Sequence, residues 1–154
     1  MSAALLALLL QTATISGNLI SPPGSSTPAS AQVTLLSSDY AKIFNAEAQR
    51  RIDRYWETYK DQFAERKEEF SRAFAFAYLE ALDITLSRMR MEGKANSATV
   101  TRTATGGNFE FRGVPPGDYK IIATSTINET NYVWTESVLV TSGQIFLQMK
   151  TRVP

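Results

Sequence analysis

The chain of 154 residues contains no cysteine and no histidine. These absences exclude disulfides and remove the usual zinc ligands and the residues of Cys–His and Ser–His nucleophilic sites. The clustered calcium candidates Asn108, Glu110 and Asp118 lack the alternating spacing of a calcium loop. Gly106-Gly107 opens a predicted strand rather than a helix, so it does not form a phosphate loop. We therefore expect no enzyme activity, no catalytic residue, no metal and no cofactor.

The chain also lacks an excess of charge of either sign. Lys and Arg number 16 against 15 Asp and Glu, and the formal net charge is +1. Basic and acidic residues are interleaved throughout the most charged segment, residues 39–92. A nucleic-acid surface needs a field of one sign, so we expect no nucleic-acid partner.

One compact hydrophobic run is present, at residues 1–11. It is too short to cross a bilayer, which takes about 20 apolar residues, so we expect no integral membrane span. The run is typical of the apolar core of a signal sequence without its basic start. The alternative is a helix or strand packed on the fold, and the sequence leaves both open for residues 1–13.

Proline and glycine are absent from residues 39–92, and this segment is predicted to be helical. Ser37, Ser38 and Asp39 are candidate N-caps, and Gly93 is a candidate stop. Apolar residues recur mostly every three, four or seven positions, so one face is continuous and must be buried. One unbroken helix would be about 80 Å long. The alternatives are a long arm that pairs with another copy or another protein, and a hairpin that folds back near residues 60–67.

An aromatic group lies at helical spacing inside this segment. It consists of Tyr55, Trp56, Tyr59 and Phe63. Packing within the chain is one interpretation, and a partner interface rich in Trp, Tyr and Arg is the other.

The strongest strand signal lies in residues 106–119. Phe109 and Phe111 alternate with polar neighbours, as in a half-buried strand. Pro115-Pro116-Gly117 then predicts a turn, and Tyr119 begins a second apolar segment. The pattern predicts a hairpin made of these two strands.

The motif G-x-F-x-F-x-x-V-P-P-G-x-Y resembles that of carboxypeptidase regulatory-like domains, a transthyretin-like and carbohydrate-binding-like group of β-sandwiches. The I-S-G of residues 15–17, the A-x-V-x-L of residues 31–35 and a closing strand pair in residues 138–149 extend the similarity. The resemblance implies an α+β fold: a transthyretin-like (prealbumin-like) Greek-key sandwich of about seven strands, with a long helical insertion between the second and third strands.

The domain boundaries follow from the composition and the resemblance together. Residues 1–11 form the apolar segment, residues 12–37 and 96–154 the sandwich, and residues 38–95 the helical insertion. Because such sandwiches are common in exported proteins, the expected location is secreted, periplasmic or cell surface. The expected function is a non-catalytic module for protein interaction or assembly at the cell envelope, with a protein partner or a second copy bound through the insertion.

The alternative function is carbohydrate binding by exposed aromatic residues of the sandwich, Tyr132 and Trp134. In a regular strand Trp134 follows Val138 and Val140 into the core, whereas a bulge near Thr135 or Glu136 turns the aromatic side chains outward. The sequence leaves core packing and sugar stacking as the two fates of this pair.

Overall fold

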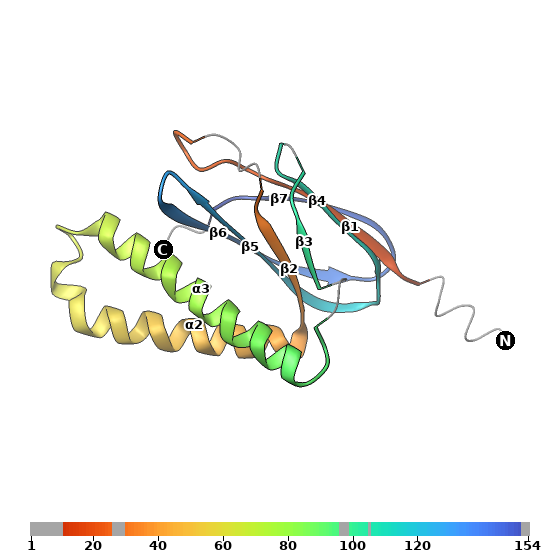
Figure 1. The fold of residues 1–154 in the computed structure, drawn as a ribbon, viewed down its shortest axis with the longest axis horizontal. Coiled ribbons are helices and arrows are strands. Elements are labelled where there is room, and N and C mark those ends of the chain that lie inside the picture. Colours follow the sequence, from red (N-terminus) through yellow and green to blue (C-terminus); the bar gives the residue numbers. More distant parts are fainter. Residues whose placement is uncertain (1–10, 26–29, 96–98, 105, 152–154) are drawn as a thin grey trace.

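The computed structural model describes residues 11–25, 30–95, 99–104 and 106–151. Within them the fold is α+β, with seven strands in two sheets and a helical insertion between the second and third strands (Figure 1). The strands are β1 (Ala13–Leu19), β2 (Gln32–Ser37), β3 (Val100–Arg102), β4 (Asn108–Val114), β5 (Gly117–Ile127), β6 (Thr130–Val140) and β7 (Gly143–Met149). The predicted strand count and the place of the insertion are confirmed. Nearly all of the apolar segment at residues 1–11 lies outside the described residues.

The insertion is a helical hairpin, one of the two geometries that the sequence left open. Helix α2 (Ser38–Tyr59) is followed by a short 3-10 turn, η1 (Lys60–Gln62), and by helix α3 (Lys67–Met91). Gly93 takes a φ of 68°, and the amide of Lys94 bonds to the carbonyl of Met89, so the predicted glycine stop is confirmed. The two helices lie side by side on one face of a sheet (Figure 1).

One sheet has the order β4-β1-β7 and the other has the order β3-β2-β5-β6. The predicted β4–β5 hairpin is therefore wrong. Phe111 on β4 pairs with Ile15 on β1, whereas Ile121 on β5 pairs with Leu35 on β2. Pro115-Pro116 carries the chain from one sheet to the other, and Tyr119 Oη donates a 2.9 Å hydrogen bond to the Pro115 carbonyl oxygen.

The two sheets enclose a core that we call the inter-sheet core. It contains the motif residues Phe109, Phe111 and Ile121, with Tyr119 packed against it. The other members are Ala13, Ile15, Leu19, Ala31, Val33, Val114, Ala123, Trp134, Val140 and Met149. No member comes from the helical insertion, so the described part of the sandwich has a core of its own.

The glycine of the I-S-G motif has a steric role. Gly17 pairs with Phe109 across β1 and β4, and the Phe109 ring lies over it. A Cβ atom at Gly17 would overlap that ring and approach the Leu147 carbonyl oxygen to 3.1 Å. Two separate motifs of the sequence therefore meet in one contact.

We predict that Gly17→Ala lowers the free energy of unfolding by about 1–3 kcal/mol, the usual cost of overpacking. Adding Phe109→Leu, which removes part of the ring, should recover some of that loss. Urea unfolding of the two variants measures both effects. An unchanged midpoint for Gly17→Ala would show that Phe109 does not lie on Gly17.

A second core, the helix–sheet core, lies between the hairpin and the four-stranded sheet. Leu36, Ile122 and Val133 contribute from the sheet, and Phe44 and Leu82 from the helices. Strand β5 therefore buries both faces, since its neighbouring residues Ile121 and Ile122 enter different cores. This two-sided burial explains why β5 carries a continuous apolar run instead of alternation.

Candidate functional site

The four predicted interface residues come together at the closed end of the helical hairpin. Tyr55, Trp56 and Tyr59 lie on the last turns of α2, and Phe63 follows η1. Three of them surround Phe70 of α3, which is almost fully buried, and Tyr59 packs against Tyr55 with the ring centroids 4.8 Å apart. The Phe70 ring lies 5.3 Å from Tyr55, 6.1 Å from Trp56 and 5.2 Å from Phe63, measured between ring centroids. We call these five residues the tip cluster.

Most of the aromatic surface of the tip cluster is buried between the two helices, where it closes the hairpin. Edge-to-face contacts of this kind stabilise aromatic pairs beyond the burial of area. Two members still reach solvent, because Trp56 is 38% exposed and Tyr59 is 40% exposed. The aromatic group is therefore an internal packing cluster with two exposed rings, which is less exposed surface than a projecting arm would offer.

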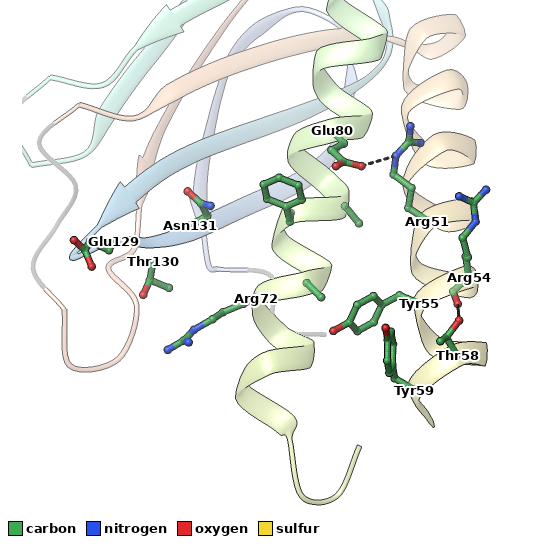
Figure 2. A pocket seen from close by; sticks show the side chains of 13 residues that line it. Arg51, Arg54, Tyr55, Thr58, Tyr59, Arg72, Glu80, Glu129, Thr130 and Asn131 are labelled. Atoms are coloured by element: carbon green, nitrogen blue, oxygen red, sulfur yellow. Dashed lines mark hydrogen bonds and ion pairs between the residues drawn. The ribbon is translucent and has the colours of Figure 1, made fainter. Parts of the chain in front are cut away.

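Beside the tip cluster lies an open cavity of about 650 Å³, which we call the hairpin groove. Figure 2 shows residues of α2, of α3 and of the β5–β6 turn arranged around it. Phe76 on α3 lines the groove and is 55% exposed. The remaining lining residues are Arg51, Arg54, Tyr55, Thr58, Tyr59, Arg72, Ala73, Ala77, Glu80, Glu129, Thr130 and Asn131.

One arginine of the groove ties the two helices together. Arg51 on α2 contacts Glu47 at 2.6 Å and Glu80 on α3 at 3.0 Å. The hydrogen bond from Arg51 lowers the pKa of the Glu47 carboxyl, and the same bond raises the pKa of the Arg51 guanidinium. The charge of Arg51 is therefore already neutralised within the hairpin.

Two other arginines of the groove are differently placed. The side chains of Arg54 and Arg72 make no ion pair or hydrogen bond with any of the described residues. Both are exposed, and they belong to different helices. The groove thus combines a half-buried tyrosine, an exposed tyrosine and an exposed phenylalanine with two guanidinium groups that are open to a negatively charged partner.

The β5–β6 turn supplies the residues that sequence reasoning missed. Asn128 and Glu129 have positive φ values of 50° and 66°, the geometry of a tight two-residue hairpin turn. The turn places Glu129 and Asn131 at the rim of the groove (Figure 2). An asparagine between two apolar strands is a turn signal and could have located the turn, although nothing local places it beside α3.

The two predicted carbohydrate contacts lie in and against the inter-sheet core. Trp134 is fully buried, and its Nε1 donates a 2.9 Å hydrogen bond to the Ile20 carbonyl oxygen. Tyr132 is half-buried and packs against the same core. The strand is regular here, and Trp134 follows Val138 and Val140 inward, so its ring offers no exposed face to a sugar.

Two classes of feature are missing from the described residues. No three acidic side chains among them gather into a group that could hold a metal ion. Within the same residues, neither helix combines the length and the apolar character needed to cross a bilayer.

No family model and no curated protein matches this chain. Among solved structures, the major pilin subunit BcpA of Bacillus cereus is 12% identical with a TM-score of 0.45, over 94% of this chain and 31% of that one. The minor pilin GBS52 of Streptococcus agalactiae is 8% identical with a TM-score of 0.44, over 95% and 46%. A proposed carbohydrate-binding protein of Pseudomonas aeruginosa is 15% identical with a TM-score of 0.44, over 92% and 90%.

This chain therefore spans less than half the length of either pilin. The function proposed below rests on the residues of this chain.

Proposed function

We propose that this chain is a non-catalytic interaction module whose helical hairpin binds a protein partner in the hairpin groove. The observation that carries the proposal is the groove itself, an open cavity of about 650 Å³ with aromatic walls and two arginines that lack partners among the described residues. Tyr, Trp and Arg are the residue types enriched in protein interfaces and in their energetic hot spots.

The lining of the groove defines the chemistry of the partner. Phe76 and Tyr59 offer apolar surface, which suits an aliphatic or aromatic side chain. Arg54 and Arg72 stand on different helices, so two separated carboxylates would satisfy them better than one small anion. The partner segment therefore carries carboxylates together with an apolar side chain.

The exposed members of the tip cluster extend the same surface. Trp56 follows Tyr55, which lines the groove, and the ring of Trp56 is partly exposed to solvent. Of the four interface residues predicted from the sequence, Tyr55 and Tyr59 line the groove, while Trp56 and Phe63 support its end. Carbohydrate binding through Trp134 has no such support, because that side chain is fully buried.

The β-sandwich is the scaffold, or mount, that carries the helical hairpin. We propose that this sandwich belongs to the carboxypeptidase regulatory-like, transthyretin-like Greek-key group. The support is that two motifs meet around the inter-sheet core: Gly17 of I-S-G contacts Phe109 of the longer motif, which also contributes Phe111 and Tyr119. Sandwiches of that group are common in exported proteins, so a secreted, periplasmic or cell-surface location is part of the same proposal. Residues 12–37 and 96–154 form the mount, and residues 38–95 the binding element.

Photo-crosslinking in the cells that naturally produce the chain tests this proposal. A photoreactive residue in place of Phe76 should give one discrete protein adduct, because Phe76 lies in the groove. Its mass separates a different protein from a second copy. The same residue in place of Met91, which is exposed on the same helix but outside the groove, should give none.

Charge reversal provides the second arm of the test. Arg54→Glu together with Arg72→Glu should reduce the Phe76 adduct about tenfold or more, equivalent to about 1.4 kcal/mol of binding. Arg90→Glu, a single charge reversal at an exposed site on α3 outside the groove, should leave it unchanged, and each of the two groove reversals alone should reduce it. Equal adducts from Phe76 and Met91, or insensitivity to the double reversal, would contradict the groove as a partner site.

A further inference from the structure

Strand β7 forms one edge of the three-stranded sheet and pairs only with β1 within the described residues. Its sequence, Gly-Gln-Ile-Phe-Leu-Gln-Met, contains no charge and no proline. Edge strands normally carry charges, prolines or bulges that block pairing with another chain. The edge of β7 has none of these protections.

The other sheet edges are protected in the described part of the chain. Strand β4 carries Glu110 and Arg112, and its Gly113 has a φ of 65°, which interrupts a regular edge. Strand β3 is only three residues long and ends in Arg102. Strand β6 contains Glu136, and Thr151 bridges to its Trp134. An unprotected edge is thus confined to β7.

The side chains of β7 are incompletely covered. Ile145 and Leu147 point toward the inter-sheet core but are only partly buried. Phe146, on the opposite face, is 65% exposed. A further strand beside β7 would bury more of all three side chains.

The hydrogen bonding of β7 shows which of its residues direct their backbone N–H and C=O groups to the open edge. The Ile20 amide bonds to the Met149 carbonyl oxygen at 2.8 Å, so the backbone groups of Met149 point toward β1. Because successive residues of a strand point their backbone groups to opposite sides, those of Gln144, Phe146 and Gln148 point to the open side. These are the groups that a new strand would use.

The sequence of β7 is nearly symmetric about Phe146. Gln144 and Gln148 lie two residues away on either side, and Ile145 and Leu147 lie one residue away. An antiparallel copy centred on Phe146 therefore places Phe opposite Phe, Gln opposite Gln and Ile opposite Leu. Each is a favourable cross-strand pair, and no charge is brought opposite a like charge.

We propose that β7 pairs antiparallel with β7 of a second copy of this chain, about a two-fold axis at Phe146. This register pairs the strand over its whole length. The two Phe146 residues then lie opposite each other and exchange both backbone hydrogen bonds. This agrees with the direction of the backbone groups inferred from Met149, which leaves those of Phe146 on the open side. The two three-stranded sheets become one continuous sheet. The hairpin groove belongs to other elements and stays free.

We expect light scattering of the purified chain to give a mass that rises to that of a dimer as the protein concentration is raised to about 1 mM. Weak association is measurable in this range. Phe146→Lys should give a monomer, because it places two like charges opposite each other. The matched control is Leu139→Lys on β6, where Leu139 is 66% exposed and Phe146 is 65% exposed. Circular dichroism should show that both variants are folded, since both sites are on the surface.

Single-cysteine variants fix the register, because the chain has no other cysteine. In the proposed pairing the two copies of residue 146 lie about 5.5 Å apart between Cα atoms, within the range that a disulfide spans. Oxidised Phe146→Cys should form a covalent dimer. Gln144→Cys alone should not, since its copies lie about 14 Å apart, but mixed with Gln148→Cys it should crosslink.

Several outcomes would overturn the proposal. A wild-type chain that stays monomeric up to about 1 mM would do so. So would equal dimer fractions for Phe146→Lys and the wild type, or a disulfide from Gln144→Cys alone. Arg54→Glu with Arg72→Glu should leave the dimer intact, so loss of groove binding and loss of dimerisation are separate results.

Discussion

Replacing Trp134 with alanine should lower the free energy of unfolding by about 3–5 kcal/mol, the usual cost of emptying a large aromatic site. Trp134 is fully buried in the inter-sheet core. Its indole also donates the hydrogen bond to the Ile20 carbonyl oxygen, which joins β6 to the chain just after β1. The substitution therefore removes packing and a long-range tether together.

Urea unfolding followed by circular dichroism measures the loss, since the substitution removes one of the two tryptophans that fluorescence would report. Trp134→Phe is the comparison variant, because it keeps an aromatic ring and most of the apolar volume while it removes the Nε1 donor and part of the ring system. It should cost less than the alanine variant, about 1–3 kcal/mol, the range for a buried acceptor that is left without its partner. A loss below about 1 kcal/mol for the alanine variant would place Trp134 outside the core.

The same substitution bears on the carbohydrate alternative. If Trp134 bound sugar at the surface, its replacement would abolish retention on a polysaccharide without changing stability. The structure instead leads us to expect a large change in stability, because the ring lies against residues of both sheets. Measuring retention and unfolding on one preparation separates these two outcomes.

Much of the sandwich could be predicted from local sequence. The strand containing Phe109 and Phe111, the apolar strand after Tyr119 and the helical stop at Gly93 all lie where the patterns placed them. Each is set by side-chain alternation or by a residue with a special backbone preference. Such signals act over a few residues and do not depend on the rest of the fold.

Strand pairing could not be read in the same way. The Pro-Pro-Gly turn after Val114 predicts a change of direction, but a tight turn does not specify whether the next strand pairs with its predecessor. That choice depends on β1 and β2, which are distant in sequence and take β4 and β5 into different sheets. Competition between distant strands decided the topology.

The helical turn shows a similar limit. Residues 60–66 contain neither glycine nor proline, so nothing local predicts that the helix ends at Tyr59. The turn is supported by contacts across it, with the Phe63 ring 5.2 Å from that of Phe70. The gain from burying the aromatic stripe on the chain itself outweighs the cost of breaking the helix.

The hairpin groove was partly predictable. The aromatic spacing singled out Tyr55 and Tyr59, which line it. Arg72 and Glu129 come to the same cavity from α3 and from the β5–β6 turn, and only the packing of α3 against β6 brings those elements together. Their proximity is a property of the tertiary fold.

The last prediction is that the sandwich folds without its helical hairpin but then associates beyond the dimer formed through β7. Deleting residues 38–95 and joining Ser37 to Asn96 removes none of the described residues that form the inter-sheet core. The new connection has only a short distance to span, because β2 and β3 are antiparallel neighbours that pair Thr34 with Val100. The deletion turns their long connection into a short one.

The same deletion uncovers the helix–sheet core. Leu36, Ile122 and Val133 are almost fully buried beneath the helices and would become an apolar patch on the sheet. Contiguous patches of this kind drive association. We therefore expect a strand-rich circular dichroism spectrum together with a particle mass well above that of the dimer that β7 alone would give.

A second form of the deletion separates folding from association. Replacing Leu36, Ile122 and Val133 with threonine gives each position a β-branched side chain, which strands favour, and removes most of the apolar patch. If Phe146→Lys is also present to block β7, this form should be a folded monomer. A disordered spectrum for both forms would mean that the hairpin supplies part of the folding core, and that residues 12–37 and 96–154 do not constitute a domain.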